Sequence, residues 1–437
     1  MSVLTLTEEQ KSIVEYTDDL YERSSQKKFT VDAPAGTGKS FLTAFMFERY
    51  KELKVIAPTH KACSVLHKTL QSHSKNITTI HRFLKAQPTI SDVGDKVFEC
   101  TKPDIENTRM IIVDECSMVK HEMFDILMEL PCTVIFFGHH GQLPPIYSDA
   151  EKQTGIDTKI SPTFRHVYFT LTKNMRSEQS IYTRVLLACL NFVENGTRPD
   201  HLIHREPIDD MLRAFVDHTE DCICITFTNT ARHHRNTEIR KALFGSIADD
   251  YVLNEKLIFR GHRKINNKLT YYSSDVITIT ELDIIAHDIY RIRCPHQSDL
   301  PKDESTPKCK VCGHPAIRKP IRQTRFYRII DQHGVEWNIP YDGDERKYMQ
   351  LYFRQYKDMI LRQSRGERKP LWVSYYNDKD LYMPSLNYAY ASTCHTAQGS
   401  QYKHVYIDIR DVRRAYSMYP KLLYTAVSRM QETVHFI

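Results

Sequence analysis

A single loop constrains the fold of this chain more than any other feature. The stretch VDAPAGTGKSF, residues 31–41, follows an apolar run and precedes an amphipathic one, which predicts a turn between a strand and a helix. At such a turn, glycines let backbone N–H groups approach an anion, and the helix start adds a favourable dipole. We therefore predict a site for nucleotide phosphates, formed by Pro34, Ala35, Gly36, Thr37, Gly38, Lys39 and Ser40.

Two side chains of this loop carry the chemistry. Lys39 supplies a positive charge for the outer phosphates of ATP, and Ser40 supplies a hydroxyl for Mg²⁺. Ala33 stands where the usual pattern begins with glycine. A chance glycine-rich turn is the alternative, and the flanking strand and helix argue against it.

A pair of acidic residues completes the predicted hydrolytic site. Asp114 and Glu115 end the apolar run in RMIIVDE. At the end of a buried strand, Asp114 can hold Mg²⁺ through water, while Glu115 can orient and deprotonate an attacking water. An ordinary acidic strand end is the alternative, and the phosphate loop upstream favours ATP hydrolysis.

The wider pattern predicts an α/β fold. Apolar runs such as KVIAP, RMIIVDE and PCTVIFFG alternate with helical stretches, which is typical of a parallel sheet covered on both faces. A second α/β pattern starts at DCICITFT and resumes only at NYAYAST and KHVYIDI. Between them the chain is β-rich and then helical and charged, so a large insertion is predicted to split the second core.

Composition restricts the class of protein without deciding it. The 437 residues suggest two to four domains, and the net charge of +6 is compatible with an anionic partner. No apolar run approaches the roughly 18 residues of a membrane span. The 11 cysteines come without a secretory signal, so we expect reduced thiols in an intracellular protein.

Further motifs supply a family resemblance. In chain order they are LTEEQKSIV, the phosphate loop, APTHKA, TTIHRF, VDECSM, GHHGQLPP, LTKNMRS, ITFTNT, STCHTAQGS and LLYTAVSR. This set and order resembles superfamily 1 DNA helicases, in particular the RecD-like 1B branch and its Dda-type phage helicases. The resemblance covers nearly the whole chain.

The resemblance implies a domain organisation. Two RecA-like parallel-sheet domains hold ATP between them, and a β-hairpin pin, a small β-barrel and a helical tower are inserted. The implied boundaries are 1–82 and 107–172 for the first RecA-like domain, 83–106 for the pin, 173–247 and 384–437 for the second RecA-like domain, 248–343 for the barrel with a Cys/His insert, and 344–383 for the tower.

The resemblance also assigns nucleotide-site residues. Arg176 and Arg429 match arginines that reach the γ-phosphate across the cleft, and Gln142 matches a γ-phosphate sensor. Gln10 matches an adenine-reading glutamine. The remaining nucleotide-binding positions that it implies are Gln398, Gly399 and Gln401.

The resemblance assigns strand contacts as well. Short hydroxyl, amide and imidazole side chains can bond phosphate oxygens without reading base sequence. The implied contacts are Pro58, Thr59, His60, Thr79, His81, Phe227, Thr228, Asn229, Thr393 and His395, with Phe98 as an aromatic of the pin tip. Each of these residues alone has an ordinary structural alternative: the pair Thr59–His60 after a strand can simply cap a helix, and Phe98 can belong to a small core under the hairpin.

Three positions depart from the family pattern. His139, followed by His140, stands where an aspartate is usual. Thr396 replaces a lysine, and Gln401 replaces an acidic residue that binds the ribose. These departures leave hydrolysis credible and put the strictness of ribose recognition in doubt.

A cysteine-rich insert fits the family poorly. CKVCGH has the ligand spacing of a zinc knuckle, and the candidate Zn²⁺ ligands are Cys294, His296, Cys309 and Cys312. Free thiols in a polar loop are the alternative.

The leading hypothesis is an ATP-dependent DNA helicase that moves on single-stranded DNA, 5′ to 3′ by family branch, and unwinds duplex DNA. The alternative is a DNA-stimulated ATPase that displaces bound proteins without processive unwinding. A P-loop kinase or metabolic ATPase would lack the motifs near residues 395 and 429. We expect a cytoplasmic monomer, in the host cytoplasm if phage-encoded. Forked DNA and replication or recombination proteins are candidate partners, and a membrane is not.

Overall fold

The computed structural model describes most of the chain in two compact units. The described residues are 6–71, 75–90, 96–103, 105–147, 149–153, 155–175, 180–245, 251–261, 263–265, 269–271, 275–290 and 320–437. One unit comprises Met1–Ala86, Cys100–Gly245 and Tyr390–Ile437, and the other comprises Gln87–Glu99 and Ser246–Ala389. Among the described residues, no helix is both long and apolar enough to cross a membrane.

The first unit contains a six-stranded parallel sheet. Its order is β3 (Ile77–Thr79), β2 (Leu53–Ala57), β6 (Met110–Val113), β7 (Thr133–Gly138), β1 (Lys28–Asp32) and β8 (Val167–Thr170). Successive strand residues face opposite sides, and both sides are apolar, as a doubly covered sheet requires. The predicted α/β class and its parallel sheet are confirmed.

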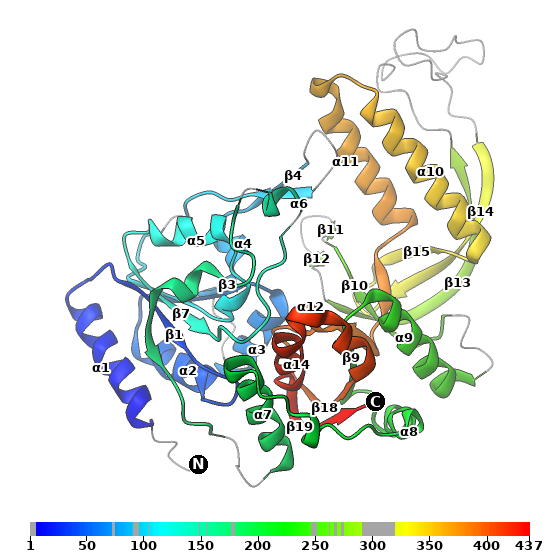
Figure 1. Ribbon diagram of the computed structural model, residues 1–437. Helices are drawn as coiled ribbons and strands as arrows, with labels where there is room; N and C mark the ends of the chain where they lie inside the picture. The colour runs from blue at the N-terminus through cyan, green and yellow to red at the C-terminus, as the bar shows by residue number, and fades with distance from the viewer. Residues whose placement is uncertain are drawn as a thin grey trace. The chain divides into compact units, whose positions relative to one another are not determined.

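Helices cover both faces of this sheet (Figure 1). Met110 and Ile112 pack in one core with α1 (Glu8–Glu22), α2 (Lys39–Arg49) and α3 (His60–Thr69). Ile111 and Val113 pack in another with α4 (Ile80–Phe83) and α5 (His121–Met128). The central strands β6 and β7 are therefore buried on both sides, and the loops at their ends are the places where a ligand can be bound.

A second parallel sheet lies in the same unit. Its order is β17 (Ala391–Thr393), β9 (Cys222–Thr226), β18 (Tyr402–Ile407) and β19 (Met430–Phe436). One face packs against α7 (Ile181–Asn195) and α14 (Tyr419–Val427), and the strands also contact α8 (Ile208–His218) and α9 (Asn229–Phe244). Strand β9 therefore shares its sheet with β17, β18 and β19, from which residues 246–389 of the other unit separate it in sequence.

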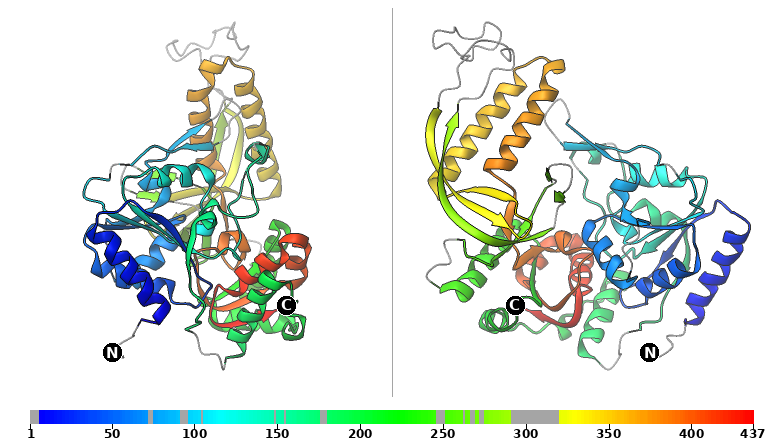
Figure 2. Two further views of the ribbon diagram at one scale, coloured as in Figure 1. Left: turned by 60° about the vertical axis from the view of Figure 1, so that its left-hand side comes forward. Right: turned by 180° about the vertical axis from the view of Figure 1, so that it is seen from behind.

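The other unit is antiparallel. Its five-stranded sheet has the order β15 (Glu336–Pro340), β14 (Pro320–Asp331), β13 (Val276–Tyr290), β10 (Lys256–Phe259) and β16 (Leu386–Tyr388), and β11 (Arg263–Ile265) pairs with β12 (Leu269–Tyr271). Figure 2 shows α10 (Gly343–Leu361) and α11 (Arg365–Tyr382) side by side along this sheet. Closure of the sheet into a barrel and the role of the two helices as a tower stay predictions.

A β-hairpin interrupts the first parallel sheet in sequence. Its strands are β4 (Gln87–Ile90) and β5 (Lys96–Glu99), and β4 lies against α11. Phe98 pairs with Pro88, next to the pair Gln87 and Glu99 at the open end of the hairpin. The register therefore places Phe98 away from the turn, whose residues 91–95 lie outside the described part of the chain.

Candidate nucleotide-binding and strand-contacting sites

The phosphate loop has the backbone geometry that its glycines predict. Gly36 and Gly38 have φ angles of +90° and +83°, a region that other residues rarely adopt. A Cβ atom at Gly38 would lie 2.6 Å from Nε2 of Gln10, and one at Gly36 would lie 2.8 Å from Oδ1 of Asn174. Gly38 also caps α2 without any side-chain hydrogen bond. The N–H groups at the start of α2 are thus left for an anion.

Lys39 is held by the loop itself. Its Nζ donates to the carbonyl oxygens of Ala33, at 2.6 Å, and Pro34, at 2.9 Å. Burial lowers the pKa of Lys39, while the neighbouring carboxylates of Glu115 and Asp114 act in the opposite direction. A phosphate group beside Nζ would supply the negative charge that a desolvated ammonium favours, so the position fits a nucleotide.

The acidic pair follows β6 as the sequence predicts. Glu115 adopts a left-handed conformation with φ +51°, which turns the chain sharply after Asp114. Burial, and then the neighbouring Glu115, raise the pKa of Asp114 to about 7. A divalent cation would favour the ionised carboxylate of Asp114, and Ser40 lines the same cavity, so both positions fit Mg²⁺.

One glutamine links the acidic pair to the second sheet. With its amide oriented to satisfy its neighbours, Gln142 donates to Oε2 of Glu115 at 3.0 Å and accepts from Nη2 of Arg429 at 3.1 Å. Nη1 of Arg429 lies 3.6 Å from Oε1 of Glu115. Arg429 is only 4% exposed, so its guanidinium is committed to this interior. The predicted base, sensor and arginine therefore form one connected group.

Helix α14, which precedes Arg429, also contacts the first sheet. Tyr424 accepts a hydrogen bond from the backbone N–H of Ala35 at 2.8 Å, and Thr425 accepts one from Leu143 at 3.1 Å. Nζ of Lys421 donates to the carbonyl oxygen of His140 at 3.0 Å. These bonds tie α14 to the phosphate loop and to the loop after β7, so a shift of either parallel sheet disturbs the nucleotide site.

A cavity of about 270 Å³ gathers the predicted residues. The predicted residues that line it are Ala35, Gly36, Gly38, Lys39, Ser40, Asp114, Glu115, Gln142, Gly399, Gln401 and Arg429. Residues from both parallel sheets thus enclose one volume, which approaches the size of a small-ligand site.

Four predicted nucleotide-site residues stand outside the cavity lining. Gln10 donates to the carbonyl oxygen of Thr37 at 3.2 Å and completes the capping box of α1 with Thr7, so its amide is bonded within the chain. Pro34 accepts from Lys39, and Gln398 donates to the carbonyl oxygen of Leu143 at 3.2 Å. The cavity walls are therefore supported by four residues that do not line it, Gln10, Thr37, Pro34 and Gln398.

Some predicted residues lie outside the described part of the chain. They are Arg176 and the candidate zinc ligands Cys294, His296, Cys309 and Cys312.

The unusual histidines lie beside the phosphate loop. Nδ1 of His140 is 2.7 Å from Oδ2 of Asp32, and this hydrogen bond raises the pKa of His140. His139 is 1% exposed, and burial lowers its pKa to about 3. Nδ1 of His139 accepts from the N–H of Gly141 at 3.1 Å, so His139 is neutral and its role is to hold this turn.

The predicted strand contacts follow the carboxyl ends of four strands. Thr59 and Thr79 follow or end the adjacent strands β2 and β3, and Thr228 and Thr393 follow or end the adjacent strands β9 and β17. The hydroxyl groups of Thr59, Thr79 and Thr228 each accept a backbone N–H as the N-cap of α3, α4 or α9. The capping role is thus real, and it uses a lone pair, not the hydroxyl proton.

The other predicted contacts share these turns. Pro58, His60, Phe227 and Asn229 are neighbours of the capping threonines, and Asn229 is exposed. His81 lies in α4 and His395 in α12 (Cys394–Ala397), and burial lowers the pKa of both. Their imidazoles are therefore neutral near pH 7, which suits hydrogen bonding and not ion pairing. Thr393 shares a hydrogen bond of 2.9 Å with Thr396, the residue that replaces the family's lysine.

Sequence reasoning missed residues that complete the cavity. Ser428 and Met175 line it, Tyr424 bonds to its phosphate loop, and Asn174 fits against Gly36. Tyr424 and Ser428 lie in LLYTAVSR, and Asn174 and Met175 in LTKNMRS, so their motifs were visible. Their contacts were not, because each depends on a partner far away in the chain.

Family models match both ends of this arrangement. Residues 19–148 match the AAA domain, which includes the phosphate loop and the acidic pair, and residues 388–437 match the UvrD-like helicase C-terminal domain. The chain is 25% identical to the ATP-dependent DNA helicase dda of Enterobacteria phage T4, over 93% of this chain and 94% of that protein. These matches support the resemblance to superfamily 1B DNA helicases that the motifs predict.

Two further comparisons extend along nearly the whole chain. It is 22% identical to an uncharacterized protein of Acanthamoeba polyphaga mimivirus, over 96% of this chain and 97% of that one. A Pif1 helicase from Bacteroides, solved in complex with ADP-AlF3 and ssDNA, superposes with a TM-score of 0.51. That match has 15% identity and covers 99% of this chain and 92% of the Pif1 chain, so it establishes a common fold.

Proposed function

We propose that this chain is an ATP-dependent DNA helicase that translocates on single-stranded DNA and unwinds duplex DNA. One observation carries the proposal. Gln142 joins Glu115 of the first parallel sheet to Arg429 of the second, inside a cavity that the phosphate loop also lines. A site built this way makes ATP hydrolysis depend on the relation between the two sheets, which is what an ATP-driven motor needs.

The chain's own residues can divide the work of hydrolysis. The N–H groups at the start of α2, together with Lys39, bind the phosphates. Glu115 orients the attacking water and accepts its proton, and Arg429 stabilises the charge that develops on the γ-phosphate. A Mg²⁺ ion at Ser40 and Asp114 would offset phosphate charge when it is bound. Gln142 hydrogen-bonds to both Glu115 and Arg429 and so fixes their positions relative to each other.

The strand-contacting turns provide the track. Each parallel sheet places threonines at the carboxyl ends of two adjacent strands, Thr59 and Thr79 in the first and Thr228 and Thr393 in the second. Phosphate oxygens are recognised there by hydroxyl, amide and backbone groups, so binding is independent of base sequence. Two such turns that change their separation with ATP would move the chain along a strand.

Several finer assignments belong to this proposal. We assign the boundaries 1–82 and 107–172, 83–106, 173–247 and 384–437, 248–343 and 344–383 to the two RecA-like domains, the pin, the barrel and the tower, as the family resemblance implies. We propose 5′ to 3′ movement, action as a monomer on forked DNA in the cytoplasm, and replication or recombination proteins as partners. The hairpin of β4 and β5 supports a duplex-separating pin.

A second candidate function deserves a direct comparison. An ATPase with the same cavity and track could displace proteins from DNA without separating strands. Both functions require stimulation of ATP hydrolysis by single-stranded DNA, and only a helicase separates a fork.

The test measures ATP hydrolysis with and without single-stranded DNA, and then unwinding of forks with a 5′ or a 3′ tail. We expect strong stimulation and separation of the 5′-tailed fork. Hydrolysis that ignores DNA would overturn the proposal. Stimulated hydrolysis with protein displacement but without fork separation would favour the second candidate.

A further inference from the structure

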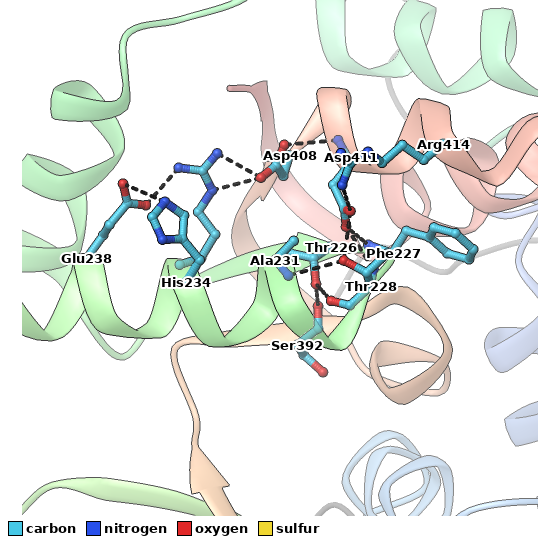
Figure 3. Close-up of polar contacts among 11 residues, drawn as sticks. Thr226, Phe227, Thr228, Ala231, His234, Glu238, Ser392, Asp408, Asp411 and Arg414 are labelled. Atoms are coloured by element: carbon cyan, nitrogen blue, oxygen red, sulfur yellow. Dashed lines mark hydrogen bonds and ion pairs between the residues drawn. The ribbon is translucent and has the colours of Figure 1, made fainter.

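One buried carboxylate holds the strand-contacting turn of the second parallel sheet. Asp411 lies in α13 (Ile409–Val412) and is 4% exposed. Its Oδ2 accepts the backbone N–H groups of Phe227, at 2.7 Å, and Thr228, at 2.8 Å, and its Oδ1 accepts the hydroxyl of Thr228 at 2.8 Å. Figure 3 shows these bonds converging on Asp411. A single side chain thus fixes both the backbone and the side chain of this turn.

Asp411 is held in place by Asp408, which in turn forms an ion pair with Arg235. Its N–H donates to Oδ1 of Asp408 at 3.2 Å. Oδ2 of Asp408 accepts from Nε of Arg235 at 2.8 Å and lies 2.7 Å from Nη2 of Arg235. Arg235 belongs to α9, the helix that Thr228 caps, so the bonds form a closed ring. The ring joins the turn, α13 and the body of α9, and it leaves Asp411 little freedom to move.

This arrangement decides what the hydroxyl of Thr228 can do. A threonine hydroxyl has one proton. The hydroxyl of Thr228 donates that proton to Asp411 and accepts the N–H of Ala231 at 3.1 Å as the cap of α9. It therefore has no proton left for a phosphate oxygen. Among the described residues, the hydroxyl of Thr59 makes only its cap bond, to Ala62 at 3.1 Å, so its proton is not committed in the same way.

We propose that Asp411 is a positioning residue for single-stranded DNA at the second sheet, and that Thr228 acts through Asp411 instead of donating to the strand. The inference rests on the proposed function, because it concerns how the DNA track is built. The turn then offers the strand the exposed Asn229 and the N–H groups at the start of α9, an arrangement that favours a phosphate.

The sign of the charge effect makes this proposal testable. A carboxylate close to DNA repels the phosphates, so removing it should strengthen binding if charge were its only influence. Nη1 of Arg414 lies 3.9 Å from Oδ1 of Asp411 and its side chain is 73% exposed, so Arg414 would also gain freedom to bind DNA. A positioning role predicts the opposite, weaker binding, because the turn loses its shape.

The experiment measures the single-stranded DNA concentration that half-saturates ATP hydrolysis, and the turnover at saturating DNA, for the full chain. Asp411→Ala should raise the half-saturating concentration about tenfold, since charge-assisted hydrogen bonds of this kind are worth at least a factor of ten. Turnover at saturating DNA should change less than about twofold, since the nucleotide cavity is untouched. Asp200→Ala is the matched control, because Asp200 also pairs with an arginine, Arg413 at 3.0 Å, but holds no turn.

Thr228 variants give a second, independent reading. Thr228→Ser keeps the hydroxyl and should bind DNA as the wild type does, whereas Thr228→Val should weaken binding. In the double variant Asp411→Ala/Thr228→Val, the increases should not multiply, because both substitutions break the same bond. Multiplying increases would mean that Thr228 contacts the strand independently and would overturn the proposal.

Unchanged or tighter DNA binding in Asp411→Ala would overturn it as well. If Asp411→Ala does not fold, the comparison of Thr228→Ser with Thr228→Val decides, and equal binding by these two variants refutes the proposal. Failure of the proposed function is distinguishable, because wild-type hydrolysis would then be insensitive to DNA in the first place.

Discussion

The nucleotide cavity and the strand-contacting turns are built on different principles. The cavity concentrates charged groups, Lys39, Asp114, Glu115 and Arg429, and residues of both parallel sheets line it. The strand-contacting turns instead carry uncharged threonine caps. Thr59 and Thr79 lie on the first sheet, and Thr228 lies on the second. ATP hydrolysis therefore depends on how the two sheets are placed relative to each other, whereas binding of the DNA strand depends on local geometry within each sheet.

We expect the largest effect from a substitution in the nucleotide cavity that leaves the strand-contacting turns unchanged. Arg429→Ala should lower the turnover of ATP by about 10³–10⁵, because an arginine of this kind stabilises transition-state charge. Nucleotide binding should persist, since the phosphate loop and Lys39 remain. Turnover and nucleotide affinity measured side by side check the prediction. Arg184→Ala, an exposed arginine of α7, is the control, and wild-type turnover in Arg429→Ala would refute the assignment.

A pH effect should come from the histidine beside the cavity. The groups that face His139 are Asp32, His140, Lys39, Lys421 and the ring of Tyr424. Its folded pKa of about 3 lies below the ordinary value, so the unfolded chain binds a proton that the folded chain does not. Its contribution to stability is therefore complete above about pH 6.5 and is lost as the pH falls.

The measurement is the free energy of unfolding at pH 7 and pH 5. His139→Asn can still accept the N–H of Gly141 and should lose about 2 kcal/mol less than the wild type between these values. The raised pKa of His140 acts in the opposite direction, because its contribution is present at low pH and fades as the pH rises. His201→Asn, at an exposed position, controls for general effects. Equal losses in wild type and His139→Asn would contradict the account.

A substitution at Thr59 should have a smaller effect, on the DNA affinity of the first sheet and not on its affinity for ATP. Thr59→Val removes the cap of α3 and also removes a hydroxyl that could donate a hydrogen bond to a phosphate oxygen. Binding of single-stranded DNA should therefore weaken about tenfold. Thr59→Ser should restore it, and the affinity for ATP should stay unchanged in both variants. Titrations with labelled DNA and labelled nucleotide test this. An equal loss of ATP affinity would show that turn and cavity are not separable.

Local sequence predicted those parts of the molecule that are formed by neighbours in the chain. The strand–loop–helix from Lys28 to Arg49 needs only its own glycines and apolar periodicity, so it was recognised directly. The α/β class followed from the apolar runs for the same reason. The resemblance of the motifs supplied Gln142 and Arg429, which local chemistry alone would not have singled out.

Long-range partners could not be predicted in this way. Asp411 bonds to Thr228 from 183 residues away, and Tyr424 reaches Ala35 from 389 residues away. The amide of Gln10 bonds to Thr7 and Thr37 where α1 begins beside the phosphate loop, and neither bond could be foreseen from the motif; its contact with adenine stays a prediction. A sequence pattern names residue types, and only the packing of distant segments decides which polar groups are used within the protein.

In this mechanism ATP hydrolysis in the cavity drives movement along DNA, and the strand-contacting turns bind the strand. Lys39→Ala separates these two roles, because Lys39 bonds only within the phosphate loop in the described structure. The measurement is single-stranded DNA affinity and unwinding of a 5′-tailed fork on the same preparation. The account predicts that unwinding is abolished while DNA affinity stays largely intact. Loss of DNA binding together with unwinding, or unwinding that persists, would contradict it.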